Sequence, residues 1–114
     1  MAIALDDKLI MALKELGEKY AVEKIVLFGS RARGDNKPTS DIDLAIFTSK
    51  EFEEKGHVAS EIDDLETLLK IDVAFITPDT DEPYFLERLK KEGVVLYELA
   101  KSAQKIELSL NKLG

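Results

Sequence analysis

Two short groups of polar residues, each beside an apolar run, hold most of the chemistry that this sequence offers. Gly29 and Ser30 follow one apolar run, and Asp41 and Asp43 stand at the start of another. A glycine lets the backbone approach a ligand closely, and a serine at a helix start offers a hydroxyl and a main-chain N–H to an anion. The first group is therefore a candidate phosphate-binding turn.

The second group is a pair of carboxylates that is suited to a metal ion. Asp41 and Asp43 are two positions apart, so on an extended strand they share a face while Ile42 and Leu44 face the core. Adjacent carboxylates repel each other unless a cation lies between them, and hard oxygen ligands favour Mg²⁺ or Mn²⁺. If the two strands are antiparallel, this pair lies beside the phosphate-binding turn. That combination suits nucleotidyl transfer, in which a metal ion bridges phosphate oxygens.

A third candidate carboxylate, Asp72, lies near the start of an expected strand over residues 70–76. A segment of crossover length joins this strand to the one expected over residues 41–47, so the two should be parallel neighbours. Parallel neighbours have their starts at the same end of a sheet. Asp72 is then expected to face Asp41 and Asp43.

The remaining apolar patterns predict the elements that position these groups. Thr48, with Glu51 three residues later, is a capping-box pattern that is expected to open a helix, in which Gly56 is a candidate break. The predicted fold class is α/β, a small mixed β-sheet of about four strands flanked by helices, with residues 1–114 forming one domain. The expected strands cover residues 22–28, 41–47, 70–76 and 94–97, and the expected helices cover 5–20, 30–34, 48–69, 81–91 and 99–113.

Composition narrows the classes of function. The chain has 114 residues, no cysteine, one histidine and a net charge of −7. The absence of cysteine excludes disulfides and thiolate zinc sites, and a single histidine argues against a His-built metal site. An acidic protein is a poor binder of long nucleic acid, whereas the locally basic segment 29–40 suits a triphosphate. With no long apolar stretch and no signal-peptide pattern, the chain is expected to be cytoplasmic and to make no membrane contact.

The two motifs together resemble a known signature. Gly29-Ser30, ten intervening residues and the block Asp41-Ile42-Asp43 are similar to the signature of the polymerase-β-like nucleotidyltransferase superfamily. In its small size, the chain resembles members of the smallest branch of this superfamily, the minimal nucleotidyltransferase domains. The continuation Arg31-Ala32-Arg33-Gly34 and the block 40–44 look most similar to antitoxins of minimal nucleotidyltransferase–HEPN toxin–antitoxin pairs.

This resemblance implies a polymerase-β-like fold and an enzyme that transfers AMP from ATP to a hydroxyl group of a partner protein. The implied acceptor is a tyrosine. The implied partner is a HEPN ribonuclease toxin, which the activity would neutralise. Two Mg²⁺ ions are implied as cofactors, and the carboxylate at position 72 would also accept the proton of the attacking hydroxyl. The implied metal ligands and catalytic groups are Asp41, Asp43 and Asp72, and the implied nucleotide-binding groups are Gly29, Ser30, Arg31 and Arg33.

Two other functions stay open on the sequence. A non-catalytic antitoxin that acts by binding alone would keep the scaffold, but the presence of all three carboxylates argues against it. A small-molecule nucleotidyltransferase of the antibiotic-modifying kind would need the added domain that larger relatives use to hold base and acceptor, unless a dimer builds the pocket. The apolar stripe of the expected helix 99–113 covers either the domain's own sheet or another chain, including a second copy in an oligomer.

Overall fold

Four strands form one mixed sheet in the computed structural model, which describes residues 4–99. Their spatial order is β3-β2-β1-β4, with β1 antiparallel to both β2 and β4, and β2 parallel to β3. This confirms the predicted α/β class and the predicted parallel pairing of β2 with β3. The antiparallel pairing of β1 with β2 meets the condition under which the carboxylate pair was expected beside the turn. The strands are β1 (Lys24–Phe28), β2 (Ile42–Phe47), β3 (Ile71–Ile76) and β4 (Val94–Glu98), and the helices are α1 (Asp7–Tyr20), α2 (Ser30–Arg33), α3 (Lys55–Asp63) and α4 (Pro83–Glu92).

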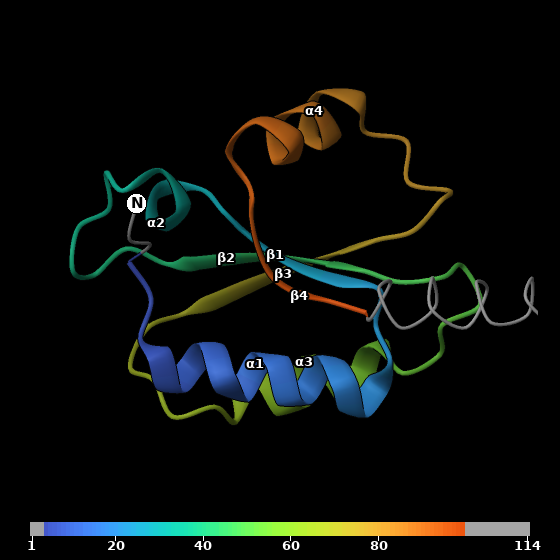
Figure 1. Cartoon of the computed structure of the whole chain (residues 1–114), viewed down its shortest axis with the longest axis horizontal. Coiled ribbons are helices and arrows are strands. Elements are labelled where there is room, and N and C mark those ends of the chain that lie inside the picture. The colour runs from blue at the N-terminus through green and yellow to red at the C-terminus, as the bar shows by residue number, and fades with distance from the viewer. Residues whose placement is uncertain (1–3, 100–114) are drawn as a thin grey trace, which may run out of the picture.

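Helices cover both faces of the sheet, and they divide the core into two parts (Figure 1). Helices α1 and α3 lie against one face, where alternate residues such as Ile25 and Leu27 of β1 join the larger apolar cluster. Helix α4 lies over the other face, where the intervening Val26 packs in a smaller cluster with Ala45 and Leu89. The period of two along a strand therefore decides which side chains meet α4.

Helix α1 begins and ends with recognisable caps. The side chain of Asp6 accepts a hydrogen bond from the backbone N–H of Lys8 at 3.1 Å, which satisfies one unpaired donor of the first turn. Ala21 ends the helix in a left-handed conformation. Between these caps, Leu9, Leu13 and Leu16 are buried at the predicted spacing.

The predicted capping box is wrong, because Thr48 belongs to the strand ladder. Its backbone N–H donates to the carbonyl of Ile76 at 2.9 Å, and its hydroxyl donates to the carbonyl of Ser49. The residue is therefore held by the pairing of β2 with β3, and α3 begins only at Lys55. Gly56 lies inside that helix and does not divide it.

Helix α4 is anchored over the end of β1 by aromatic packing. The rings of Phe28 and Phe85 meet edge to face, with their centroids 5.2 Å apart. Pro83 occupies the first turn, where a proline is tolerated, and Gly93 follows the last residue. The expected helix 99–113 lies outside the described residues. None of the helices within residues 4–99 is long and apolar enough to cross a membrane.

Candidate functional site

The sheet register places the turn after β1 and the predicted carboxylates at one end of the sheet. Phe28, which directly precedes the turn, pairs with Asp43 across the antiparallel ladder. On its other side Asp43 pairs with Asp72 across the parallel ladder. Asp41 lies two residues before Asp43 and is exposed. The structure therefore brings together the carboxylates and the turn that the sequence motifs singled out.

These carboxylates lie on the face of the sheet that α4 covers. Asp43 is two residues from Ala45, and Asp72 is four residues from Ile76, so each shares a face with a member of the smaller apolar cluster. Helix α4 packs on the same cluster through Leu89. Its charged residues are therefore available to the carboxylate end of the sheet.

Asp43 is the carboxylate with the most perturbed environment of the three. Burial raises the pKa of Asp43, and the neighbouring carboxylates of Asp72 and Asp41 raise it further. The guanidinium groups of Arg88 and Arg33 act in the opposite direction without cancelling the rise. Ionised Asp43 is thus destabilised by its neighbours, and a bound cation would relieve that repulsion.

The carboxylates suit a hard divalent cation whose remaining ligands are supplied by a substrate. Across residues 4–99, no group of three His, Asp or Glu side chains is gathered as a ready-made metal site. One oxygen of Asp72 instead lies 3.4 Å from the Lys70 ammonium group. Mg²⁺ in proteins is commonly held by one or two carboxylates, with substrate phosphates and water completing the shell. The paired carboxylates fit that pattern.

Gly29 is required by both its backbone and its neighbour. Its φ of 76° and ψ of −159° fall in a region that is essentially restricted to glycine. A Cβ at this position would overlap Oδ2 of Asp43. The turn therefore approaches the Asp43 carboxylate as closely as a backbone can, and Ser30 begins α2 directly after it.

Arg31 has a structural role in this arrangement. Its guanidinium donates to the backbone carbonyls of Ala4 at 2.8 Å, Ser40 and Pro38 at 3.0 Å, and Lys37 at 3.5 Å, and the residue is 7% exposed. These bonds tie the loop between α2 and β2 to the helix, which sets the position of Asp41. Its placement argues against the expected phosphate contact, which the sequence had allowed for Arg31 and Arg33 alike.

Replacing Arg31 with methionine is expected to lower the free energy of unfolding by about 2–4 kcal/mol, because four backbone carbonyls lose the charged donor that a buried guanidinium supplies. That corresponds to a fall in melting temperature of roughly 10–20 °C. The matched control is Arg33→Met on the same helix, whose side chain is 40% exposed and whose ion pairs stabilise little. Thermal melts of the two variants decide the point, and equal melting temperatures would contradict the assignment.

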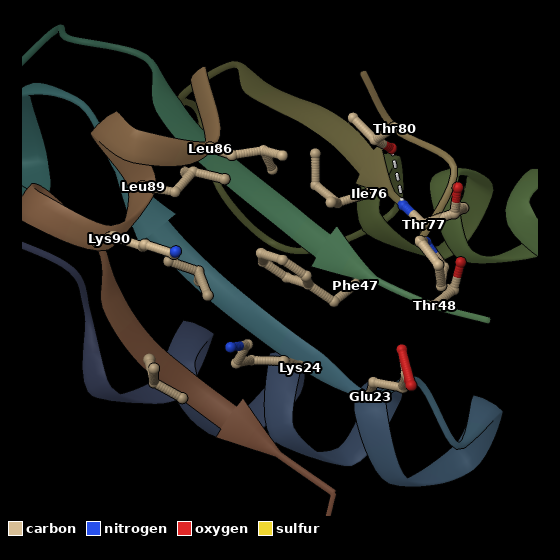
Figure 2. Close-up of a pocket in the computed structure, with 14 residues that line it drawn as sticks. Glu23, Lys24, Phe47, Thr48, Ile76, Thr77, Thr80, Leu86, Leu89 and Lys90 are labelled. Atoms are coloured by element: carbon tan, nitrogen blue, oxygen red, sulfur yellow. Dashed lines mark hydrogen bonds between the residues drawn. The ribbon is translucent and has the colours of Figure 1, made fainter. Parts of the chain in front are cut away.

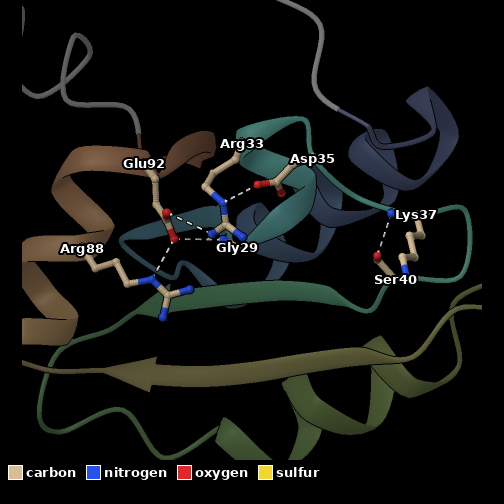
Figure 3. A network of polar contacts seen from close by, with 7 residues as sticks. All are labelled: Gly29, Arg33, Asp35, Lys37, Ser40, Arg88 and Glu92. Carbon is tan, nitrogen blue, oxygen red and sulfur yellow. Dashed lines mark hydrogen bonds and ion pairs between the residues drawn. The ribbon is translucent and has the colours of Figure 1, made fainter.

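Arg33 belongs to a polar network that also includes two residues of α4 (Figure 3). Its guanidinium contacts Asp35 and Glu92, each at 3.1 Å, and Glu92 also contacts Arg88 at 2.9 Å. The sequence motifs did not point to Arg88 or Glu92. Their spacing of four residues indicates a helical ion pair, but that signal alone does not connect the pair to the turn after β1.

An apolar cavity in the described part of the chain lies at the opposite end of the strands (Figure 2). It has a volume of about 610 Å³ and is lined by apolar side chains such as Val26 and Phe47, with Lys24 at its edge. Lys24 begins β1 and Phe47 ends β2, whereas the carboxylates lie where β1 ends and β2 begins. This cavity is therefore separate from the candidate site.

Comparison with known proteins agrees with the fold. The chain matches the family model "Polymerase beta, Nucleotidyltransferase" over residues 11–102. It is 44% identical over 70 residues to "Putative protein adenylyltransferase MJ1215" of Methanocaldococcus jannaschii, covering 59% of this chain and 77% of the relative. It is 33% identical over 81 residues to "Putative protein adenylyltransferase MJ1379" of the same organism, covering 69% and 81%.

Solved structures with the same fold include one from Sulfolobus solfataricus, described as a "putative nucleotidyltransferase". It is 25% identical to this chain with a TM-score of 0.53, and the match covers 82% of this chain and 84% of that one. A toxin–antitoxin complex with AMP-PNP is 16% identical with a TM-score of 0.59, covering 91% and 85%. A mutant of the toxin–antitoxin pair MntA–HpeT is 16% identical with a TM-score of 0.57, covering 96% and 86%.

The family match and the relatives named as adenylyltransferases identify a nucleotidyltransferase. The chain belongs to the polymerase-β-type nucleotidyltransferase family, as the match over residues 11–102 shows.

Proposed function

We propose that this nucleotidyltransferase transfers AMP from ATP to a hydroxyl group of a partner protein. The observation that carries the proposal is the register of Asp43, which pairs with Phe28 before the turn and with Asp72 on the other side. An anion-binding turn and a carboxylate pair thus adjoin. The names of the two Methanocaldococcus relatives support a protein acceptor, and the AMP-PNP complex of a structural neighbour supports ATP as the donor.

The metal-binding part of the proposal assigns Mg²⁺, as two ions, to Asp41, Asp43 and Asp72. Bound Mg²⁺ would supply positive charge that bridges phosphate oxygens and offsets the charge of the transition state. The raised pKa of Asp43 among its neighbouring carboxylates supports this assignment, because crowded carboxylates are stabilised by a cation. The backbone at Gly29, the Ser30 hydroxyl and Arg33 would hold the outer phosphates.

The reaction itself is a substitution at the α-phosphorus of ATP. The acceptor oxygen forms a bond to this phosphorus, the bond from the phosphorus to the bridging oxygen breaks, and pyrophosphate leaves. The acceptor proton passes to the carboxylate of Asp72, whose side chain is 46% exposed and therefore accessible to a group that arrives from outside. A tyrosine hydroxyl fits this role because it becomes a good nucleophile only when a base accepts its proton.

The partner in this proposal is a HEPN-type ribonuclease toxin, and this chain is its antitoxin. The toxin–antitoxin neighbours of the same fold support a toxin partner. In the proposal, residues 1–114 form one minimal nucleotidyltransferase domain, with residues 99–113 as a docking element for the partner. An added AMP places a bulky anion on the toxin, which would repel an RNA substrate.

The test uses ATP labelled at either the α- or the γ-phosphate, with Mg²⁺ and the HEPN-type protein that is proposed as the partner. The α-label is expected on the partner and the γ-label in released pyrophosphate. Transfer of the γ-label would show phosphorylation instead. Inhibition of the partner without any transferred label would establish an antitoxin that acts by binding alone.

A further inference from the structure

The carboxylate of Glu92 is bound by three donors, one from the turn after β1, one from α2 and one from its own helix α4 (Figure 3). Its Oε1 accepts from the backbone N–H of Gly29 at 3.3 Å and from Nε of Arg88 at 2.9 Å. Its Oε2 accepts from Nη1 of Arg33 at 3.1 Å. The side chain of Glu92 is only 16% exposed. A backbone N–H and two guanidinium groups thus converge on one partly enclosed anion.

The same donors are the kind that proteins use to bind phosphate. A backbone N–H in a tight turn and guanidinium groups both favour phosphate oxygens, and guanidinium groups often bind them in pairs. Burial raises the pKa of Glu92, but the hydrogen bonds from Arg33, Gly29 and Arg88 outweigh burial and leave the pKa below its ordinary value. Glu92 is therefore an anion at neutral pH. It occupies a position at which the same donors could bind a phosphate group instead.

This anion position adjoins the carboxylates of the sheet. The turn that donates to Glu92 is the one whose Gly29 leaves no room for a Cβ beside Asp43. Both Arg88 and Arg33 lower the pKa of Asp43, so their charges are close to it. The ring of Phe28, which pairs with Asp43, lies 6.0 Å from the guanidinium carbon of Arg88. A polyphosphate that reaches the carboxylates from this side meets both guanidinium groups.

We propose that Glu92 is an internal counter-ion that occupies the position of the outer phosphates of the nucleotide, and that Arg88 is a further nucleotide-binding residue. This inference rests on the proposed function, because it deepens the same site. Binding of a triphosphate transfers the Gly29 N–H and the two guanidinium groups from Glu92 to phosphate oxygens. Glu92 is the last residue of α4, so its side chain can turn outward without unwinding the helix.

The exchange has a consequence for affinity. Every donor that Glu92 holds must be released before phosphate can take it, so the carboxylate competes directly with the ligand. A highly charged triphosphate with Mg²⁺ can displace it, whereas a single weakly charged anion gains less from the same donors. Glu92 thus keeps Arg33 and Arg88 oriented in the free protein and discriminates against small anions.

The test is calorimetric titration of the full chain with ATP and with inorganic tripolyphosphate, both with Mg²⁺. Glu92→Gln is expected to bind both ligands about tenfold more tightly, since the competing charge is gone. Arg88→Gln is expected to bind both at least about tenfold more weakly, with partial recovery in Arg88→Lys. The control Asp79→Asn removes a carboxylate on an exposed loop that is outside this network, and it should bind as the wild type does.

Weaker or unchanged binding by Glu92→Gln, together with wild-type binding by Arg88→Gln, would overturn the inference and leave Glu92 as a structural clamp. Should Glu92→Gln fail to fold, the Arg88 variants and the ¹⁵N-resolved amide signal of Gly29 decide, because that signal must shift when tripolyphosphate replaces the carboxylate. Failure of the proposed function has a different signature. If the binding pattern holds but no AMP reaches a partner, only the proposed function fails. If neither the wild type nor any variant binds ATP, the proposed function and this inference are both overturned.

Discussion

Asp43→Asn is expected to lower AMP transfer about a thousandfold, which corresponds to roughly 4 kcal/mol of lost transition-state stabilisation. The reason is its position, because Asp43 pairs with Asp72 on one side and adjoins the Gly29 turn on the other. Initial rates of AMP transfer to the partner would measure the loss. Asp79→Asn, on an exposed loop, serves as the matched control and should keep the full rate.

The same substitution is expected to stabilise the metal-free protein, and the gain should depend on pH. Burial and the neighbouring carboxylates raise the pKa of Asp43 above its ordinary value of 3.8, so the folded state holds this proton more tightly than the unfolded state. The stability that the protonated carboxyl provides is full below pH about 3.8 and is lost as the pH rises through the folded-state pKa. Asp43→Asn does not lose stability in this way, because asparagine does not ionise.

Thermal melts in EDTA should therefore show equal melting temperatures for the wild type and Asp43→Asn at low pH. At neutral pH the variant should melt at the higher temperature. Mg²⁺ with ATP should then stabilise the wild type more than the variant, because ligand binding to the folded state raises its stability. A difference between the two proteins that stays constant with pH would contradict the crowding of the carboxylates.

Gly29→Ala is expected to destabilise the fold by about 3 kcal/mol or more and to abolish measurable ATP binding. The alanine would have to adopt a backbone conformation that is essentially restricted to glycine, and its Cβ would displace the Asp43 carboxylate. Gly34→Ala separates the two effects. Gly34 also has a positive φ, of 89°, but a Cβ there would have nothing within 4 Å, so only about 1–2 kcal/mol should be lost.

The two glycine variants are compared by thermal melts and by ATP titration. Gly34→Ala should bind ATP with wild-type affinity despite its lower melting temperature. If Gly29→Ala bound ATP equally well, the turn after β1 would not be a phosphate site.

The strands and the parallel pairing of β2 with β3 could be predicted from the sequence because local patterns carry that information. Apolar runs marked the strands, and the length of the segment between residues 47 and 71 required a parallel crossover. Parallel pairing of these strands predicts that Asp72 faces Asp41 and Asp43. The predicted start of α3 was wrong because the backbone N–H of Thr48 bonds to Ile76 of the neighbouring strand. A hydrogen bond between distant segments of the chain has no local sequence signature.

The arginines show where sequence reasoning reaches its limit. Arg31 and Arg33 lie on the same short helix, and only the closure of the loop up to Ser40 decides which of them is buried. Arg88 and Glu92 lie on a helix whose amphipathic pattern predicts burial of Leu89 but not the direction in which α4 crosses the sheet. That direction brings the end of α4 to the Gly29 turn, and it depends on packing such as the contact between Phe28 and Phe85.

The most direct test of the central claim is the intact mass of the HEPN-type partner after incubation with this protein, ATP and Mg²⁺. The account predicts a gain of one or more whole AMP units, located on a tyrosine by fragmentation, together with loss of ribonuclease activity. Asp43→Asn, tested in parallel, should leave the mass of the partner unchanged and its ribonuclease active. A partner that is fully inhibited by the wild-type chain yet unchanged in mass would contradict the claim that the carboxylate site silences it by AMP transfer.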